Sequence, residues 1–147
     1  MYFTYDEFIK SATADKQNID NKPTDIQIIN NIHTLMGVME LIRENWTVYC
    51  IEQNLKKPQI IITSGYRCKT LNKAVGGTSS SSHMFGTTCD FKSNNGHNRA
   101  LWNVVVDTLT KYEIPFNQLI DEKNYSWIHL DLMNIIGEQR QEILHLK

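Results

Sequence analysis

The stretch Trp127-Ile128-His129-Leu130-Asp131-Leu132 alternates between apolar and polar side chains. Ile128, Leu130 and Leu132 fall on one side of an extended chain, and the residues between them fall on the other. This period of two predicts a β-strand. Its apolar face packs into a core, and its other face is free to carry polar chemistry.

Two further strands are predicted upstream. Residues 58–63 form a β-branched apolar run that ends at Ser64-Gly65, which indicates a buried strand followed by a turn. Residues 89–92 indicate a second short strand. Between them, residues 66–88 contain few apolar side chains, and a loop this long inside a compact domain is usually functional or disordered.

Three helices accompany these strands. Apolar residues recur every three or four positions from Ile28 to Ile42, which predicts a helix over residues 25–45 with Thr24 as its N-cap. A second helix is expected after residues 94–96, and a capping-box pattern at Thr4 and Glu7 predicts a short first helix. We therefore expect an α+β fold, with a small antiparallel sheet and flanking helices.

The length and composition exclude several classes of protein. A chain of 147 residues fits one domain, residues 1–147. Its 15 basic and 16 acidic residues nearly cancel, so the protein has no strong electrostatic field with which to bind a nucleic acid. No apolar run is long enough for membrane insertion, and the N-terminus does not resemble a signal peptide. We expect synthesis in the cytoplasm. The three cysteines, Cys50, Cys68 and Cys89, are expected to be free thiols, with a Cys68–Cys89 bridge as the alternative.

One set of residues has the chemistry of a catalytic zinc site. His83 lies in the long loop, Asp90 in the strand that follows, and His129 on the polar face of the late strand. Zinc binds histidine nitrogen and carboxylate oxygen, and a catalytic site has three protein ligands. If the strands of Asp90 and His129 pair antiparallel, the three side chains converge on one face of the sheet. The remaining histidines, His33, His97 and His145, are interpreted as structural or exposed.

Around these residues, an ordered series of motifs resembles the zinc D-alanyl-D-alanine carboxypeptidase family. The series is Ser64-Gly65-Tyr66-Arg67, Asn72, Val75-Gly76-Gly77, Ser81-x-His83, Gly86, Asp90, Gln118-Leu119-Ile120-x-Glu122 and Trp127-Ile128-His129. The segment from Phe8 to Pro23 is also similar to that family. The resemblance implies a hedgehog-like α+β domain, one catalytic zinc ion and action on peptidoglycan peptides. The family includes phage endolysins.

The resemblance also implies roles for individual residues. The zinc ligands would be His83, Asp90 and His129. Arg67 would contact the substrate carbonyl or carboxylate, Ser81 the substrate backbone, and Trp127 would line the substrate pocket or fill space.

The general base is the point at which the sequence departs from the family. Many relatives have an acid three residues before the last histidine, where this chain has Ser126. Other relatives have a glutamate about six residues before it. Here Glu122 is the candidate base, with a loop at 123–126 that is longer by one residue, and Asp121 is the alternative.

Two hypotheses about function follow from the sequence. The first is a zinc metallopeptidase, expected to be a monomer, that cleaves peptidoglycan stem peptides at a D-alanyl or neighbouring bond, as a carboxypeptidase or an endopeptidase. It would act on the bacterial cell wall, with phage lysis as one setting. The second is an inactive zinc-containing module that binds a wall peptide or a protein.

Overall fold

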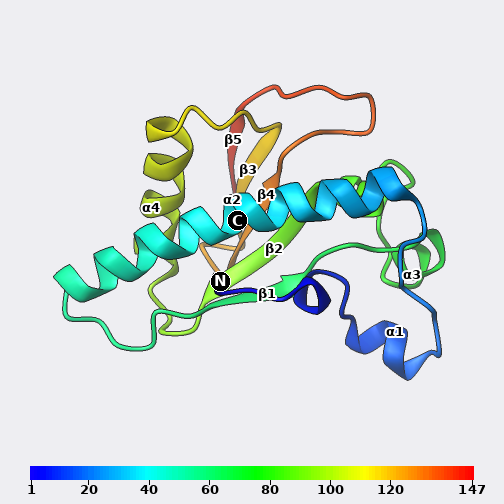
Figure 1. The fold of residues 1–147 in the computed structure, drawn as a ribbon, viewed down its shortest axis with the longest axis horizontal. Helices are drawn as coiled ribbons and strands as arrows, with labels where there is room; N and C mark the ends of the chain where they lie inside the picture. The colour runs from blue at the N-terminus through cyan, green and yellow to red at the C-terminus, as the bar shows by residue number, and fades with distance from the viewer.

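The computed structural model describes residues 1–147 and has an α+β fold (Figure 1). The strands are β1 (Ile60–Ser64), β2 (Thr88–Ser93), β3 (Gln118–Glu122), β4 (Trp127–Asp131) and β5 (Glu142–Leu146). The helices are α1 (Ala12–Lys16), α2 (Ile26–Glu52), α3 (Lys69–Ala74) and α4 (Asn98–Lys111), with short 3-10 helices η1 (Tyr5–Phe8) and η2 (Ser82–Phe85).

The five strands form one sheet in the order β1-β2-β4-β3-β5. The pairs β1–β2, β2–β4 and β3–β4 are antiparallel, as expected. The pair β3–β5 is parallel, so the sheet is antiparallel except at this edge. A parallel neighbour requires a crossover connection. The segment between β4 and β5 supplies this connection by returning to the beginning of β3.

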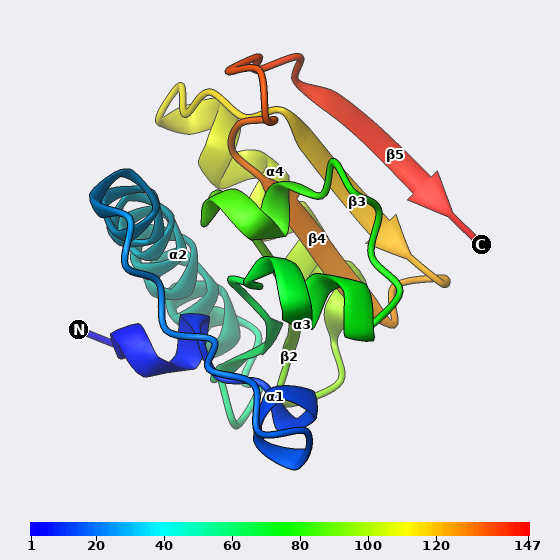
Figure 2. The ribbon, with the colours of Figure 1, turned by 90° about the vertical axis from the view of Figure 1, so that its right-hand side faces the viewer.

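Helices α2 and α4 cover one face of the sheet, where the hydrophobic core lies (Figure 1). The apolar side chains of β4, Ile128 and Leu130, are fully buried in this core, as the alternation predicts. The chain between β1 and β2, including α3 and η2, lies over the other face (Figure 2). The sheet therefore has a closed apolar face and a second face that carries polar side chains.

The long helix α2 extends further than the sequence indicated. Its buried stripe continues beyond Ile42 through Trp46 and Cys50 at the same spacing of four, so the helix continues to Glu52. Its N-cap is Asp25, whose side chain accepts a hydrogen bond from the backbone N–H of Gln27; the expected cap, Thr24, was wrong by one residue.

The segment 66–88 is more regular than a long loop. It contains α3, which is capped by the Cys68 sulfur, and η2, which ends at Gly86 with φ of 75°. A Cβ at Gly86 would lie 2.8 Å from the Ile28 carbonyl oxygen of α2. Only glycine therefore allows the turn that directs the chain from η2 into β2.

Two other expectations are settled by the structure. The capping box of Thr4 and Glu7 is present, although it begins a 3-10 helix. Cys50, Cys68 and Cys89 are all free, so the alternative of a Cys68–Cys89 bridge was wrong. None of the helices is both long enough and apolar enough to span a membrane.

Candidate metal centre

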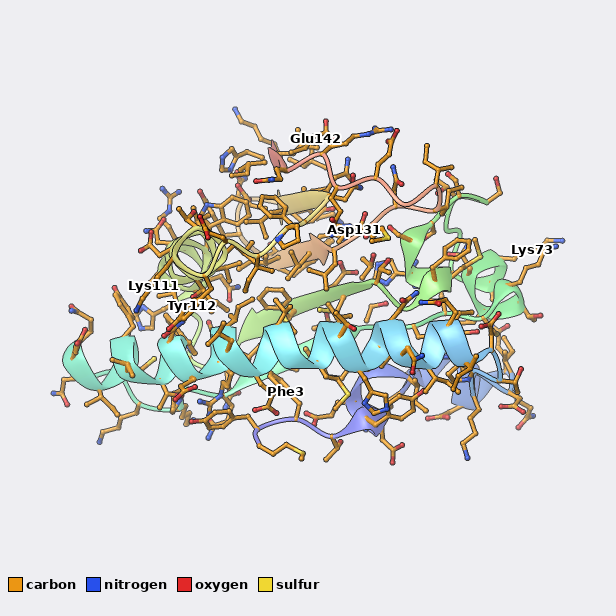
Figure 3. All side chains as sticks on the ribbon, turned by 45° about the horizontal axis from the view of Figure 1, so that its top comes forward. Phe3, Lys73, Lys111, Tyr112, Asp131 and Glu142 are labelled. Atoms are coloured by element: carbon orange, nitrogen blue, oxygen red, sulfur yellow. The ribbon has the colours of Figure 1, made fainter.

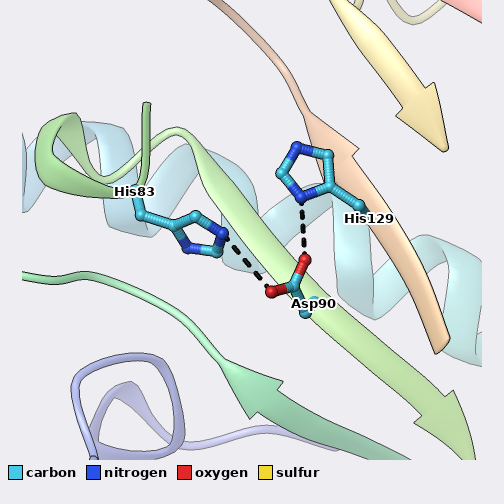
Figure 4. A group of neighbouring side chains, drawn as sticks. All are labelled: His83, Asp90 and His129. Carbon is cyan, nitrogen blue, oxygen red and sulfur yellow. Dashed lines mark hydrogen bonds and ion pairs between the residues drawn. The ribbon is translucent and has the colours of Figure 1, made fainter. Parts of the chain in front are cut away.

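The pairing of β2 with β4 brings two of the predicted ligands together. Asp90 is directly opposite His129 in the antiparallel register, so both side chains project from the same face of the sheet. The Asp90 carboxylate is 2.8 Å from Nδ1 of His129 through Oδ1 and 3.4 Å from Nε2 of His83 through Oδ2 (Figure 4). His83 reaches this point from η2, so three separate elements supply the cluster.

The donor set fits a zinc ion. Nitrogen and oxygen atoms from His83, Asp90 and His129 all lie within 4.8 Å of one another, which is close enough for a single ion to contact all three. The Nδ1 atom of His83 is 2.8 Å from the Gly65 carbonyl oxygen. When the Nδ1–H group donates a hydrogen bond to this carbonyl, the tautomer is fixed and Nε2 is left as the ligand atom. This arrangement is common to metal-binding histidines.

Electrostatics keep the cluster in a form suited to a cation. Burial alone would raise the pKa of Asp90, but hydrogen bonds from His129 and His83 hold this pKa well below its usual value. Burial would also lower the pKa of His129, yet its hydrogen bond to Asp90 raises the pKa above the ordinary value. Asp90 is therefore an ionised carboxylate that already attracts positive charge to this point.

Arg67 lies beside the cluster on the side of β1. Its Nη2 atom is 3.9 Å from Oδ2 of Asp90, and the Ser64 hydroxyl accepts hydrogen bonds from its guanidinium. Burial lowers the pKa of Arg67, partly offset by the charge of Asp90. A guanidinium held beside a potential metal site can stabilise negative charge that develops on a substrate oxygen.

The comparison with protein families agrees with this geometry. The model of the family described as Peptidase M15 matches residues 1–131, which include all three candidate ligands and Arg67. The chain belongs to the peptidase M15 family. This family consists of zinc peptidases similar to D-alanyl-D-alanine carboxypeptidases. Among curated proteins, none matches the sequence.

In this M15 peptidase, Glu122 lies on the same face as the metal cluster. It is opposite Trp127 at the end of the β3–β4 ladder, while Ile120 is opposite His129. Glu122 is therefore a diagonal neighbour of His129, within reach for a long side chain. Trp127 also faces this side, and the ammonium group of Lys123 lies 5.4 Å from its ring centroid.

Asp121 points away from the metal cluster. It pairs with Ile128, whose side chain is in the core, and it is 3% exposed. Its carboxylate accepts a hydrogen bond from the backbone N–H of Tyr125 and is 2.6 Å from Nδ1 of His145 on β5. The structure thus gives Asp121 a role in joining β3 to β5 and does not bring it to the proposed site.

Ser81 lies in a polar hollow of about 320 Å³ beside His129. All the lining residues are polar. They include Gln118, which belongs to a motif quoted above, and three residues that were not identified from sequence: Asn117, Asn134 and Arg140. Asn134 and Arg140 come from the connection to β5, which lies beyond the residues that the family model matches. No motif marks Asn134 or Arg140, because their position depends on the parallel pairing of β5.

A buried carboxylate supports the ligand strand at one end. Asp131, two residues after His129, is 1% exposed and accepts hydrogen bonds from Thr88 Oγ1 at 2.8 Å and Asn117 Nδ2 at 2.7 Å. These bonds tie β4 to β2 and to the residue preceding β3. The alternation predicted the face of Asp131 but gave no indication of these partners.

Proposed function

We propose that this M15 peptidase hydrolyses peptidoglycan stem peptides at a D-alanyl or neighbouring peptide bond, with zinc held by His83, Asp90 and His129. Family membership supports a zinc peptidase that acts on peptidoglycan. The observation that carries the proposal for this chain is the convergence of the three ligand atoms beside Arg67. The bond that is cleaved, and the choice between carboxypeptidase and endopeptidase, belong to the proposal.

The protein side chains divide the chemistry between them. When bound, zinc would act as a Lewis acid toward the scissile carbonyl and would lower the pKa of water at the site. Arg67 would hold the substrate by its carbonyl or terminal carboxylate, since its planar guanidinium binds oxygen atoms in pairs. Ser81 would donate a hydrogen bond to the peptide backbone, and Trp127 would form an apolar wall.

Glu122 would act as the general base. Its carboxylate would accept a proton from the attacking water and donate it to the leaving amine, a role worth about 10²- to 10⁴-fold in rate. The register supports this assignment because Glu122 projects from the face that carries His129. The same register turns Asp121 into the core side of the sheet.

Action on the bacterial cell wall by a monomeric enzyme, with phage lysis as one setting, is part of the same proposal. The net charge of −1 means that long-range attraction contributes little to finding an anionic or cationic surface. Contacts within the site, chiefly Arg67 and the segment 66–88, would therefore determine recognition.

The test compares Glu122→Gln with wild type on purified muropeptides. We expect the variant to retain one zinc per chain and to lose at least 10²-fold in turnover. Glu44→Gln, which changes an exposed glutamate on α2, is the matched control and should keep wild-type turnover. If zinc-loaded wild type releases neither D-alanine nor a shortened peptide, the peptidase hypothesis is refuted. The alternative, an inactive zinc-containing binding module, is then favoured.

A further inference from the structure

A groove runs along the outer edge of β1 and reaches Arg67, which lies beside the metal centre. It has a volume of about 640 Å³, within the range of ligand-binding clefts, and all five residues of Ile60–Ser64 line it. Its opposite wall is formed by the N-terminal segment and α1, from which Tyr2, Lys10 and Thr13 contribute. Arg67 lines the groove and its Nη2 atom is 3.9 Å from Asp90 Oδ2, so this residue joins the groove to the metal centre.

The edge of β1 that faces this groove has unpaired main-chain groups. β1 is the first strand in the sheet order and pairs only with β2. The Gln59 carbonyl accepts a hydrogen bond from Asn94 on the β2 side, and antiparallel ladders alternate bonded with non-bonded pairs. Ile60 and Ile62 therefore turn their N–H and C=O groups outward. Such an edge can accept an extended peptide as an added strand.

The far end of the groove contains an arginine that forms no ion pair with a carboxylate. Burial lowers the pKa of Arg43, and the charge of Glu40 is among those that partly offset this. Arg43 of α2 lines the groove, is only 8% exposed, and takes part in none of the five ion pairs of the protein. It contacts the Thr47 hydroxyl and lies 4.4 Å from the Tyr2 ring centroid. Glu40, three residues earlier, is bonded instead to the backbone N–H groups of Tyr2 and Phe3. A buried guanidinium that forms no ion pair within the protein can bind an anion.

Basic side chains outnumber acidic ones in the lining of the groove. Lys10, Arg43 and Arg67 face a single carboxylate, that of Glu7, which already accepts the Thr4 N–H at 2.6 Å. α2 and β1 run in opposite directions, so Arg43, in the second half of α2, lies toward the beginning of β1 (Figure 1). Figure 3 shows Phe3, one of the lining residues from the N-terminal segment, beside α2.

We propose that this groove binds the chain of the substrate peptide as an extended strand on β1, with a side-chain or backbone carboxylate of that peptide held by Arg43. The inference rests on the proposed function for the identity of the peptide. Four residue steps along β1 cover about 13 Å, so the carboxylate would lie about four residues from the bond at the metal centre. A stem peptide would thus be recognised along its length and not only at its end.

The test uses two synthetic pentapeptides ending in D-alanyl-D-alanine, with Glu or Gln as the fourth residue before the terminal bond. Binding to the metal-free protein is measured by fluorescence anisotropy, so that turnover is not needed. Wild type should bind the Glu peptide at least about tenfold more tightly, as for a hydrogen bond between charged groups. Arg43→Gln should abolish this preference, whereas Lys111→Gln, which removes a charge on α4, should preserve it.

A second pair of variants tests the added strand. Ile62→Pro removes the outward N–H and should weaken binding of both peptides about three- to tenfold, while Ile62→Val, the packing control, should bind like wild type. Equal binding by the Pro and Val variants would overturn strand addition. If the Pro variant does not fold, peptides N-methylated at alternate amides replace it, and binding as tight as that of the unmethylated peptides would overturn strand addition.

The outcomes separate this inference from the proposed function. Hydrolysis by the zinc-loaded protein without any preference for the Glu peptide would overturn the proposal that the groove binds the peptide, and would leave the proposed peptidase activity supported. A preference that depends on Arg43 in a protein that cleaves no wall peptide would support the groove and overturn the peptidase. If the protein both cleaves the peptide and binds it in the groove, Arg43→Gln should raise KM for the Glu peptide more than it lowers kcat.

Discussion

Gly65→Ala should impair the metal centre although Gly65 is not a ligand. A Cβ at this position would lie 2.1 Å from the Phe8 carbonyl oxygen and 2.9 Å from the Phe8 Cα, both backbone atoms. The two segments would have to separate by more than about 1 Å to reach ordinary contact distance. That movement affects two bonds at once. Tyr66 N–H donates to Phe8 O at 2.7 Å, and Gly65 O is the partner of His83 Nδ1.

The expected magnitude combines these two losses. Loss of the Tyr66–Phe8 hydrogen bond together with overpacking should reduce the free energy of unfolding by about 1–3 kcal/mol. Loss of the carbonyl that orients His83 should weaken zinc binding by about 10- to 100-fold. The assays are urea unfolding of the metal-free protein and a zinc titration against a chromophoric chelator.

Gly37→Ala provides the matched control. Nothing lies within 4 Å of a Cβ at Gly37, which is inside α2, so this variant should be stabilised by about 0.5–1 kcal/mol with unchanged zinc affinity. Our reasoning fails if Gly65→Ala binds zinc as tightly as wild type and unfolds at the same urea concentration.

Two other predictions concern the rest of the fold. Asp131→Ala should lower the free energy of unfolding by about 2–4 kcal/mol, since it leaves the buried Asn117 amide unpaired. Denaturant titration measures this difference, and a change below about 0.5 kcal/mol would contradict the prediction. In the folded protein at pH 8, iodoacetamide should modify Cys68 before Cys50, whose thiol pKa is raised by burial, and before the buried Cys89. Peptide mass mapping over time gives the order, and early labelling of Cys50 would show that this part of the core opens readily.

The ligand cluster could be predicted because its signals are local. The period of two in β4 assigns His129 to the polar face without any knowledge of its neighbours, and β2 is short and follows the loop that contains His83. Antiparallel pairing of the two strands was then sufficient to bring Asp90 opposite His129. The donor chemistry of these three side chains completed the argument.

The features that sequence could not provide depend on contacts between distant segments. The face on which Asp121 lies depends on the register of β3, and only this register separates it from Glu122. The pairing of β5 with β3 is parallel and follows an irregular connection, so no turn signal marks it. Arg43 is one position from the stripe of α2, and its burial results from Tyr2 packing over it.

The most direct measurement of the central claim is hydrolysis of purified muropeptides as zinc is titrated into the metal-free protein. Activity should rise in proportion to added zinc and reach its plateau at one ion per chain, because His83, Asp90 and His129 form a single site. A chelator should abolish it. Product formation that is independent of zinc, or the absence of product at full zinc occupancy, would contradict the account.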